Sequence, residues 1–292
     1  MRLIIVSGLS GSGKSVALRV LEDIGYYCID NMPAALLKSV IDEITSGNLP
    51  RAELLAVGID ARNPRGSLES LPRLLSDLEQ QGIGTELLFL QSDDDILLRR
   101  YSETRRRHPL EEQGTELRSA ISKEREMLGD VLNAADLVID TSRSSIYELA
   151  DIIRGRIDRR KPRSLSVMIE SFGFKYGIPA DADFVFDLRS LPNPYWSLEL
   201  RGLTGRDEEV IRFLDEQPAF RKMFNDILVF LNDWIPEYES VNRGYLTVAC
   251  GCTGGQHRSV YMADKLAQAL RESHDQVMAR HNVLSSHSVS DQ

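Results

Sequence analysis

The sequence has few cysteines, few tryptophans and no long apolar run. Its 292 residues include three cysteines and two tryptophans. The cysteines, Cys28, Cys250 and Cys252, are odd in number and lack the spacing of a disulfide framework or a zinc site. No apolar run approaches the ~20 residues that a transmembrane helix needs, and the first residues lack the pattern of a signal peptide. We therefore expect a cytoplasmic protein with no membrane partner.

Positive charge is also scarce. The chain carries 35 Lys and Arg against 44 Asp and Glu, a formal net charge of −9. This charge repels phosphate backbones, which argues against a general nucleic-acid binder and leaves room only for a local basic patch. The hydrophobic content of 42% is ordinary for a globular protein. The length favours two domains.

Short apolar runs alternate with stretches of helical periodicity in the amino-terminal half. This alternation predicts buried parallel strands joined by helices, and so an α/β fold. Strands are expected at residues 3–6, 26–29, 54–59, 87–90 and 137–140. Helices are expected from residue 14 to about 24, at 67–81, at 94–106 and up to about 157. The first domain is therefore predicted over residues 1–157.

A basic stretch with a proline, residues 158–164, is predicted to be a linker, because dense like charge and proline fit poorly inside a packed element. The pattern then restarts with strands at 165–169, 184–188 and 245–250 and helices at 207–216, 218–235 and 258–272. These elements predict a second α/β domain over residues 165–284. The Ser-rich residues 285–292 are expected to form a flexible tail.

The first apolar run leads into a complete P-loop pattern. Its residues are Gly8, Leu9, Ser10, Gly11, Ser12, Gly13, Lys14 and Ser15. The glycines let consecutive N–H groups converge on phosphate oxygens, and the helix that follows adds its positive end. The Lys14 ammonium is expected to reach the β- and γ-phosphates and the Ser15 hydroxyl to ligate Mg²⁺. The sequence thus predicts ATP or GTP, bound with Mg²⁺, and gives Lys14 and Ser15 the catalytic roles.

Two aspartates and an arginine cluster follow later strands. Asp30 and Asp60 stand at strand ends, where they can serve a metal or a substrate, or simply form turns and caps. Arg99, Arg100 and the run 105–107 fit either the lid of a small-molecule kinase or a solvated helix face. A kinase that uses Asp30 as its base is therefore an alternative function.

A second glycine loop lies between a strand and a helix near the carboxyl end. Its candidate ligand-binding residues are Cys252, Thr253, Gly254, Gly255, His257, Arg258 and Ser259. The amides, hydroxyls and guanidinium predict a second anion cradle. The spacing Cys252-x5-Arg258 also fits a cysteine-dependent phosphatase, with a general acid among Asp181, Asp183 and Asp187. Binding is the favoured reading, because the donors alone explain the loop.

Taken together, the motifs resemble those of the RapZ (YvcJ-type) nucleotide-binding proteins. The resemblance covers residues 1 to about 281 and rests on the segments 8–15, 30–31, 60–63, 99–109, 170–177, 181–196 and 252–260. It implies a P-loop kinase-like domain followed by a domain akin to a phosphofructokinase subdomain. It also implies weak ATPase and GTPase activity, with residues 8–15 as the ATP loop.

Site residues and partners follow from the same resemblance. The GTP-associated segment would be Asp60, Ala61, Arg62 and Asn63. The family's sugar-phosphate site would correspond to Thr253, Gly254 and Arg258, with Tyr195 from the loop 193–196. Some family members are RNase adapters that bind small regulatory RNAs, present them to an endoribonuclease and sense glucosamine-6-phosphate. We also expect a homo-oligomer.

This sequence departs from the adapter pattern at three places. Residues 271–292 do not form the basic tail of the adapters, Gln256 replaces a familiar Lys, and Tyr195 replaces a His. Fewer cations mean less counterion release, so RNA affinity should be weaker. The ligand of the second domain is expected to be an amino-sugar phosphate or a nucleotide sugar. We predict a nucleotide-binding regulator with weak NTPase activity.

Overall fold

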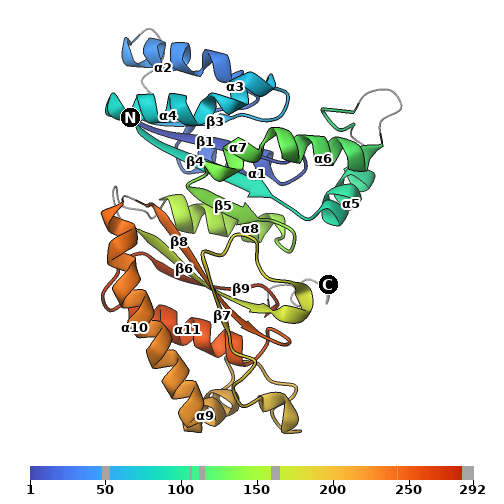
Figure 1. Cartoon of the computed structure of the whole chain (residues 1–292), viewed down its shortest axis with the longest axis vertical. Helices are drawn as coiled ribbons and strands as arrows, with labels where there is room; N and C mark the ends of the chain where they lie inside the picture. The colour runs from blue at the N-terminus through green and yellow to red at the C-terminus, as the bar shows by residue number, and fades with distance from the viewer. Residues whose placement is uncertain (48–52, 105–106, 112–115, 159–164, 242, 285–292) are drawn as a thin grey trace. The chain divides into compact units, whose positions relative to one another are not determined.

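The computed structural model describes residues 1–47, 53–104, 107–111, 116–158, 165–241 and 243–284. The chain divides into two compact units, Met1–Asp158 and Arg159–Gln292. This boundary falls one residue after the predicted end of the first domain. The predicted linker 158–164, apart from Asp158, and the predicted tail 285–292 lie outside the described residues. Figure 1 labels the helices and strands of each unit.

The first unit is built on a five-stranded parallel sheet with the order β2-β3-β1-β4-β5. Its strands are β1 (Arg2–Gly8), β2 (Tyr27–Ile29), β3 (Leu54–Gly58), β4 (Gly84–Gln91) and β5 (Leu137–Asp140). Every predicted strand of this half is confirmed. The central strand, β1, is buried from Leu3 to Gly8, as expected for a strand covered on both faces. The loop after β1 therefore opens at the middle of the sheet's carboxyl edge.

The helices of the first unit are α1 (Lys14–Asp23), α2 (Leu37–Thr45), α3 (Arg65–Glu69), α4 (Leu71–Gln80), α5 (Asp94–Thr104), α6 (Leu117–Met127), α7 (Gly129–Asn133) and α8 (Ile146–Ile153). Short helical turns η1 (Ala34–Leu36) and η2 (Arg154–Asp158) adjoin α2 and α8. Helix α1 packs against β1 and α8, while α4 packs against β4 and α7. The prediction of a single helix at 67–81 is wrong, because the helix is interrupted at Ser70. A new helix, α4, begins at Leu71 with Pro72 in its first turn.

The second unit is built on a four-stranded parallel sheet with the order β7-β8-β6-β9. Its strands are β6 (Ser166–Gly173), β7 (Phe184–Asp187), β8 (Tyr245–Cys252) and β9 (Val277–His281), and its helices are α9 (Glu208–Glu216), α10 (Pro218–Ser240) and α11 (Arg258–Leu270). Turns η3 (Phe174–Tyr176) and η4 (Pro194–Trp196) lie in the connections. Helix α11 covers β6, β8 and β9, and α10 packs on α11 (Figure 1).

Each sheet holds its own apolar core. The first core includes Leu3, Ile5 and Val57, and the second includes Val167, Leu246 and Leu266, all of them fully buried. Among the described helices, none has both the length and the apolar surface that crossing a membrane requires. The two sheets place two glycine loops at the carboxyl ends of β1 and β8, where parallel α/β sheets bind their ligands.

Candidate functional site

The P-loop joins the end of β1 to the start of α1, as the sequence predicts. Gly8 has φ 134°, and a Cβ on it would lie 2.0 Å from the carbonyl oxygen of Leu90. Only glycine therefore allows β1 to turn this close to β4. Gly13, with φ 107°, makes the last turn before α1. The result is a tight backbone loop that opens at the positive end of a helix.

The Lys14 side chain lies along its own loop. Its Nζ donates to the carbonyl oxygens of Gly8 and Leu9, at 2.7 and 3.1 Å. Burial lowers the pKa of Lys14, although the nearby carboxylates of Glu124, Asp60 and Asp30 oppose that shift. Besides the positive charge of Arg62, three carboxylates therefore act on the ammonium. A polyphosphate that enters this site meets their repulsion, which a divalent cation would offset.

A buried carboxylate on α6 holds the tip of the P-loop. Glu124, fully buried, accepts hydrogen bonds from the Ser10 backbone N–H (2.9 Å) and the Ser10 hydroxyl (2.6 Å). It also lies 3.0 Å from Nε2 of His108. The Nδ1 of His108 accepts from the Leu110 N–H, so the ring proton is on Nε2 and faces Glu124. Burial raises the pKa of Glu124, but His108, Lys14 and Ser10 together hold it below the ordinary value.

Arg100 connects α5 to the P-loop. Its guanidinium donates to the carbonyl oxygen of Gly11 (3.0 Å) and to the carbonyl oxygen of Thr141 (2.7 Å). The Thr141 hydroxyl donates in turn toward the Ser12 carbonyl oxygen at 3.0 Å. Arg100 therefore braces the loop backbone. Arg99, also named as a lid residue, forms an exposed pair with Glu103, and residues 105–106 of that cluster lie outside the described part of the chain.

Residues 60–63 form a compact turn directly after β3. Asp60 is buried and accepts from the Arg62 guanidinium at 3.0 Å (Nε) and 2.6 Å (Nη2). Burial raises the pKa of Asp60, but the hydrogen bonds from Arg62 and the charge of Lys14 keep it below the ordinary value. An ionised carboxylate near Lys14 is suited to the divalent cation that accompanies the phosphates of a nucleotide. Ala61 is buried within the same turn.

Asn63 ties this turn to the loop after β2. Its Oδ1 accepts from the Ala34 N–H at 2.6 Å, and its Nδ2 donates to the carbonyl oxygens of Met32 (3.2 Å) and Asp60 (3.1 Å). The side chain is buried. Both ends of the amide are therefore engaged within the protein.

The residues available to Mg²⁺ are hydroxyl and carboxylate groups of the kind that this ion prefers. Ser15 is exposed in the first turn of α1. Asp30 is exposed at the end of β2, beside β3, and its Oδ1 accepts from the Asn31 N–H at 2.7 Å. No group of three His, Cys, Asp or Glu suited to a metal occurs among the described residues. The donors present thus fit an ion that a nucleotide's own phosphates help to ligate.

The second glycine loop starts at Cys252, the last residue of β8, and ends at Arg258, the first of α11. It packs on β6, because a Cβ on Gly173 would lie 2.8 Å from the Gly254 carbonyl carbon. The Cys252 Sγ accepts from the Gly255 N–H at 3.2 Å and lies 3.2 Å from the Ser259 Oγ. Burial raises the pKa of Cys252, but these donors and the Arg258 charge bring it below the ordinary value.

Arg258 lies under the loop with 3% of its surface exposed. Its Nη1 donates to the carbonyl oxygens of Leu188 (3.3 Å), Arg189 (3.1 Å) and Leu191 (2.8 Å). Its Nε is buried and has no hydrogen-bond partner among the described residues. The Nη1 of Arg258 is thus committed to the chain after β7, while the charge of the guanidinium and a side-chain hydrogen bond act on Cys252.

The segment between β7 and α9 lies against the same loop. The buried His257 places its Nε2 3.2 Å from the Leu200 carbonyl oxygen, and the Gly205 N–H donates to the Gln256 carbonyl oxygen at 2.8 Å. Thr253 is exposed. Tyr195 is 46% exposed, and its ring lies 4.7 Å below the Arg201 guanidinium. Among the described residues, Tyr195 contacts Asn193, Trp196 and Arg201, and its role as a ligand stays a prediction.

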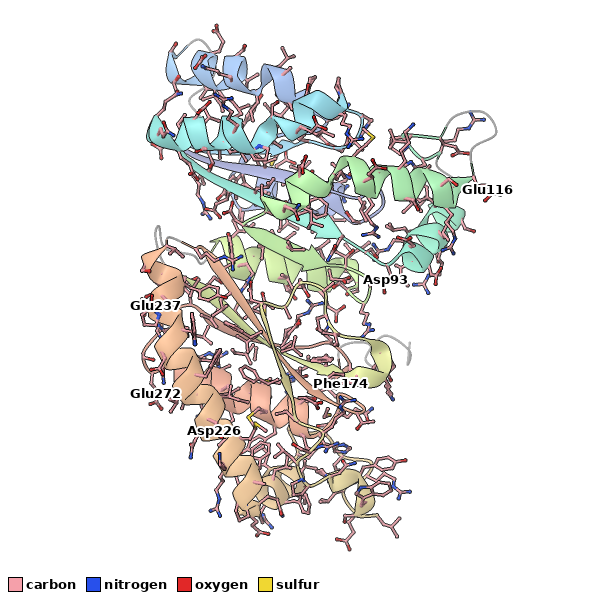
Figure 2. All side chains as sticks on the ribbon, viewed as in Figure 1. Asp93, Glu116, Phe174, Asp226, Glu237 and Glu272 are labelled. Atoms are coloured by element: carbon pink, nitrogen blue, oxygen red, sulfur yellow. The ribbon has the colours of Figure 1, made fainter. Side chains whose placement is uncertain are left out.

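Aromatic rings support the strand ends beneath the cradle. Phe174, labelled in Figure 2, packs on Phe172 with ring centroids 4.9 Å apart. The Arg189 guanidinium lies 3.8 Å from the Phe174 ring centroid and also donates to the Asp187 carboxylate through Nε and Nη2. The Arg189 hydrogen bonds hold the pKa of Asp187 below its ordinary value. Asp187 is therefore ionised at neutral pH.

A buried polar chain that the sequence did not reveal links β6, β9 and α11. The Ser171 Oγ lies 2.8 Å from Nδ1 of His281, whose Nε2 lies 3.1 Å from the Asp264 carboxylate. The order matches a hydrolase triad, but Ser171 has no exposed surface. Ser171 also lies on β6, between β8 and β9 in the sheet, so this chain of hydrogen bonds holds these elements together.

Comparison with known proteins identifies both units. Residues 1–161 match the family described as "RapZ-like N-terminal domain", and residues 165–285 match "RapZ C-terminal domain". A "Nucleotide-binding protein" of Halorhodospira halophila is 51% identical over 285 residues, covering 98% of this chain and 99% of that protein. A "Nucleotide-binding protein in ptsN-ptsO intergenic region" of Stutzerimonas stutzeri is 49% identical over 288 residues, covering 97% of this chain and 100% of that protein.

Solved structures resemble the chain more distantly. A shikimate kinase from Bacteroides thetaiotaomicron covers 52% of this chain and 94% of its own, with a TM-score of 0.34 and 14% identity. A gluconokinase from Sinorhizobium meliloti covers 51% of this chain and 87% of its own, with a TM-score of 0.33 and 19% identity.

Proposed function

The chain belongs to the RapZ family, in both its amino- and carboxy-terminal domains, and from that premise we propose that it is a nucleotide-dependent regulator. Its amino-terminal unit binds MgATP or MgGTP and hydrolyses it slowly. Its carboxy-terminal unit binds a phosphorylated metabolite, an amino-sugar phosphate or a nucleotide sugar. The observation that carries the proposal is the pair of strand–glycine loop–helix cradles, each at the carboxyl edge of its own parallel sheet.

The amino-terminal cradle supports nucleotide binding through its backbone and its cation. The loop after β1 opens at the start of α1, and the Lys14 ammonium is held 2.7 Å from the Gly8 carbonyl oxygen. To bind the phosphates, the Lys14 ammonium would exchange its hydrogen bonds to the Gly8 and Leu9 carbonyl oxygens for bonds to phosphate oxygens. We expect Ser15 and Asp60 to serve the metal and its bound water. A slow reaction fits this site, because the carboxylates around Lys14 oppose the charge that develops on the transferred phosphoryl group.

The choice between ATP and GTP is not expected to depend on Asn63. Its Oδ1 and Nδ2 are both bonded within the protein, so it has no edge with which to read a base. The segment 60–63 is therefore proposed to act at the phosphates through Asp60 rather than at the purine.

The nucleotide proposal is tested by calorimetry. Wild type should bind MgATP or MgGTP saturably, and Lys14→Ala should weaken the affinity by about tenfold or more, because a charge-assisted contact to the phosphates is lost. Lys38→Ala, an exposed lysine on α2, is the matched control and should bind as wild type does. Equal affinity of Lys14→Ala and wild type would contradict the assignment.

A small-molecule kinase is the second candidate, and one observation favours it. Asp30 stands at the end of β2, and its charge acts on Lys14 across the carboxyl edge of the sheet. An acceptor hydroxyl bound there could give its proton to Asp30. Phosphate transfer from labelled ATP into a metabolite pool, abolished in Asp30→Asn, would establish the kinase. Release of free phosphate alone would support the slow NTPase.

We propose that this protein binds RNA more weakly than the RNase adapters of the family do. A partner RNA and an endoribonuclease follow from the family resemblance, and we also propose a homo-oligomer. The chain's net charge of −9 limits the number of phosphate contacts. Filter binding with small structured RNAs across a salt series measures this directly. We expect weak binding with a shallow salt slope.

A further inference from the structure

The loop between β8 and α11 has the arrangement of a thiol nucleophile site. Cys252 ends the strand, five residues follow, and Arg258 and Ser259 begin a helix of 13 residues. The backbone N–H groups of Gly255, in the loop, and Ser259, in the first turn of the helix, act on the sulfur. This is a set of positive partial charges around one atom, which is what a thiolate needs in order to persist at neutral pH.

Two donors already bond the sulfur. The Gly255 N–H donates to Sγ at 3.2 Å, and the Ser259 hydroxyl lies 3.2 Å away. A purely structural cysteine gains little from such donors, because a neutral thiol is a weak acceptor. A thiolate gains much more, because hydrogen bonds to charged groups are about twice as strong as neutral ones.

Arg258 supplies the means to hold a phosphoryl group above the sulfur. Its side chain is buried and interacts with Cys252, and its Nε–H has no hydrogen-bond partner among the described residues. A buried donor left unpaired is costly, so the site favours an acceptor that is absent from the protein itself. Cys252 itself is 2% exposed, whereas the side of Gly254 where a Cβ would stand is open space and Thr253 is exposed, so a ligand would approach from the Gly254 side.

We propose that Cys252 is the nucleophile of a phosphoryl-transfer reaction on a phosphomonoester. The Sγ lone pair forms an S–P bond while the bond between phosphorus and the ester oxygen breaks, and that oxygen leaves with the electron pair and takes a proton from solvent. Water then attacks phosphorus, the S–P bond breaks, and the electron pair returns to Sγ. The net products are an alcohol and inorganic phosphate. The inference rests on the same cradle as the proposed metabolite site.

The structure also sets the kind of ester. Asp187 ends β7 opposite Gly251 and is the nominated acid nearest the cradle in the sheet register. Hydrogen bonds from the backbone N–H and the guanidinium of Arg189 keep it ionised, so it has no proton to give to a leaving group. Asp183 is bonded by the Thr247 N–H and by Arg243. The preferred substrates are therefore esters whose alcohol is acidic, such as aryl phosphates.

The test uses the full-length protein with para-nitrophenyl phosphate, stopped with acid and analysed by intact mass and peptide mapping. We expect one phosphoryl group on Cys252. In Ser259→Ala the hydroxyl that stabilises the departing thiolate is lost, so the adduct should break down roughly tenfold more slowly and accumulate. Cys252→Ser should carry no adduct at that position and release no nitrophenolate. Cys28→Ser, in the other unit, should behave as wild type does.

Two measurements separate this inference from the proposed function. Calorimetry with glucosamine-6-phosphate and with inorganic phosphate reports binding in wild type and in Cys252→Ser. Binding without an adduct in either wild type or Ser259→Ala overturns the nucleophile and leaves the metabolite site standing. Nitrophenolate release that survives in Cys252→Ser also overturns the nucleophile. Absence of binding by either ligand instead contradicts the metabolite site.

Discussion

Glu124 is the single residue whose chemistry is least expected from its sequence context. It lies in a helix rich in charge, yet its carboxylate is fully buried and bonds Ser10 and His108. Its pKa in the folded state lies below the ordinary value of 4.5. Its contribution to stability is therefore fully present above that ordinary value and is lost as the pH falls through the lower, folded pKa.

The prediction at this scale concerns Glu124→Gln. The amide keeps the shape but loses the charge, so hydrogen bonds from Ser10 and His108 weaken. We expect the first unit to lose about 1–3 kcal/mol at neutral pH. The loss should shrink at acid pH, where the wild-type carboxylate is protonated as well. Urea denaturation at the two pH values measures both. A variant equally destabilised at neutral and acid pH would show that packing, not charge, explains the effect.

Other residues of the site were predictable to very different degrees. The P-loop and the Cys252–Ser259 loop can be identified from the sequence alone, because in each of them glycines, a cation and hydroxyls follow a strand at fixed spacing. Glu124 and Thr141 have no such signal, since each reaches the loop from more than 100 residues away. Asp60 was named, but its pairing with Arg62 and the internal bonding of Asn63 depend on side-chain directions that spacing does not give.

At the scale of elements, helix α8 shows how a local cap supports the nucleotide loop. Ser145 accepts from the Glu148 N–H at 3.2 Å, and Glu148 accepts from the Ser145 N–H at 2.7 Å. This capping box fixes where the helix begins. Helix α8 packs on α1, which carries the end of the P-loop.

Ser145→Ala removes one half of that capping box. We expect the first unit to be destabilised by about 1 kcal/mol, with the second unit unaffected. Chemical denaturation followed by a probe in each unit measures the difference. Ser39→Ala, exposed on α2, is the control. A shift of equal size in both units would argue against a local effect.

Gly173→Ala tests the element that carries the second cradle. The added Cβ would lie 2.8 Å from the Gly254 carbonyl carbon and 2.9 Å from the Gly255 nitrogen, so the loop must move away from β6. We expect loss of phosphate binding in the second unit and unchanged nucleotide binding in the first. Gly202→Ala has open space around its Cβ and should bind normally. Calorimetry with inorganic phosphate distinguishes the two variants.

Strands were easier to predict than the helices between them. Apolar runs buried on both faces mark β1, β3 and β4 without ambiguity. Strand β9 was missed, because Arg280 and His281 occupy the end of a short edge strand and make it resemble a loop. Helix α6 was missed because its exposed face is densely charged and only a few positions, such as Ala120 and Ile121, reach the core.

At the scale of the whole molecule, two units with separate sheets and separate cores predict separate unfolding. Met1–Asp158 and Arg159–Gln292 each hold one cradle. A ligand that binds only a folded unit stabilises that unit, by about 2.7 kcal/mol at a hundredfold excess over its dissociation constant. We expect Mg-nucleotide to raise the unfolding temperature of one transition and inorganic phosphate that of the other, in calorimetric scans. A single transition moved equally by both ligands would indicate one cooperative unit.

The hydrogen bonds between Ser10 and Glu124 have a consequence for the rate of nucleotide binding. The Ser10 N–H at the tip of the P-loop already donates to Glu124. A triphosphate that binds this N–H would therefore have to displace the Glu124 carboxylate. This displacement requires that the hydrogen bond between Ser10 and Glu124 break first, or that the Ser10 N–H be shared between the carboxylate and the phosphate. Association at high nucleotide concentration would then level off at the rate of that release, so α6 would govern how fast the protein responds, whatever its final affinity.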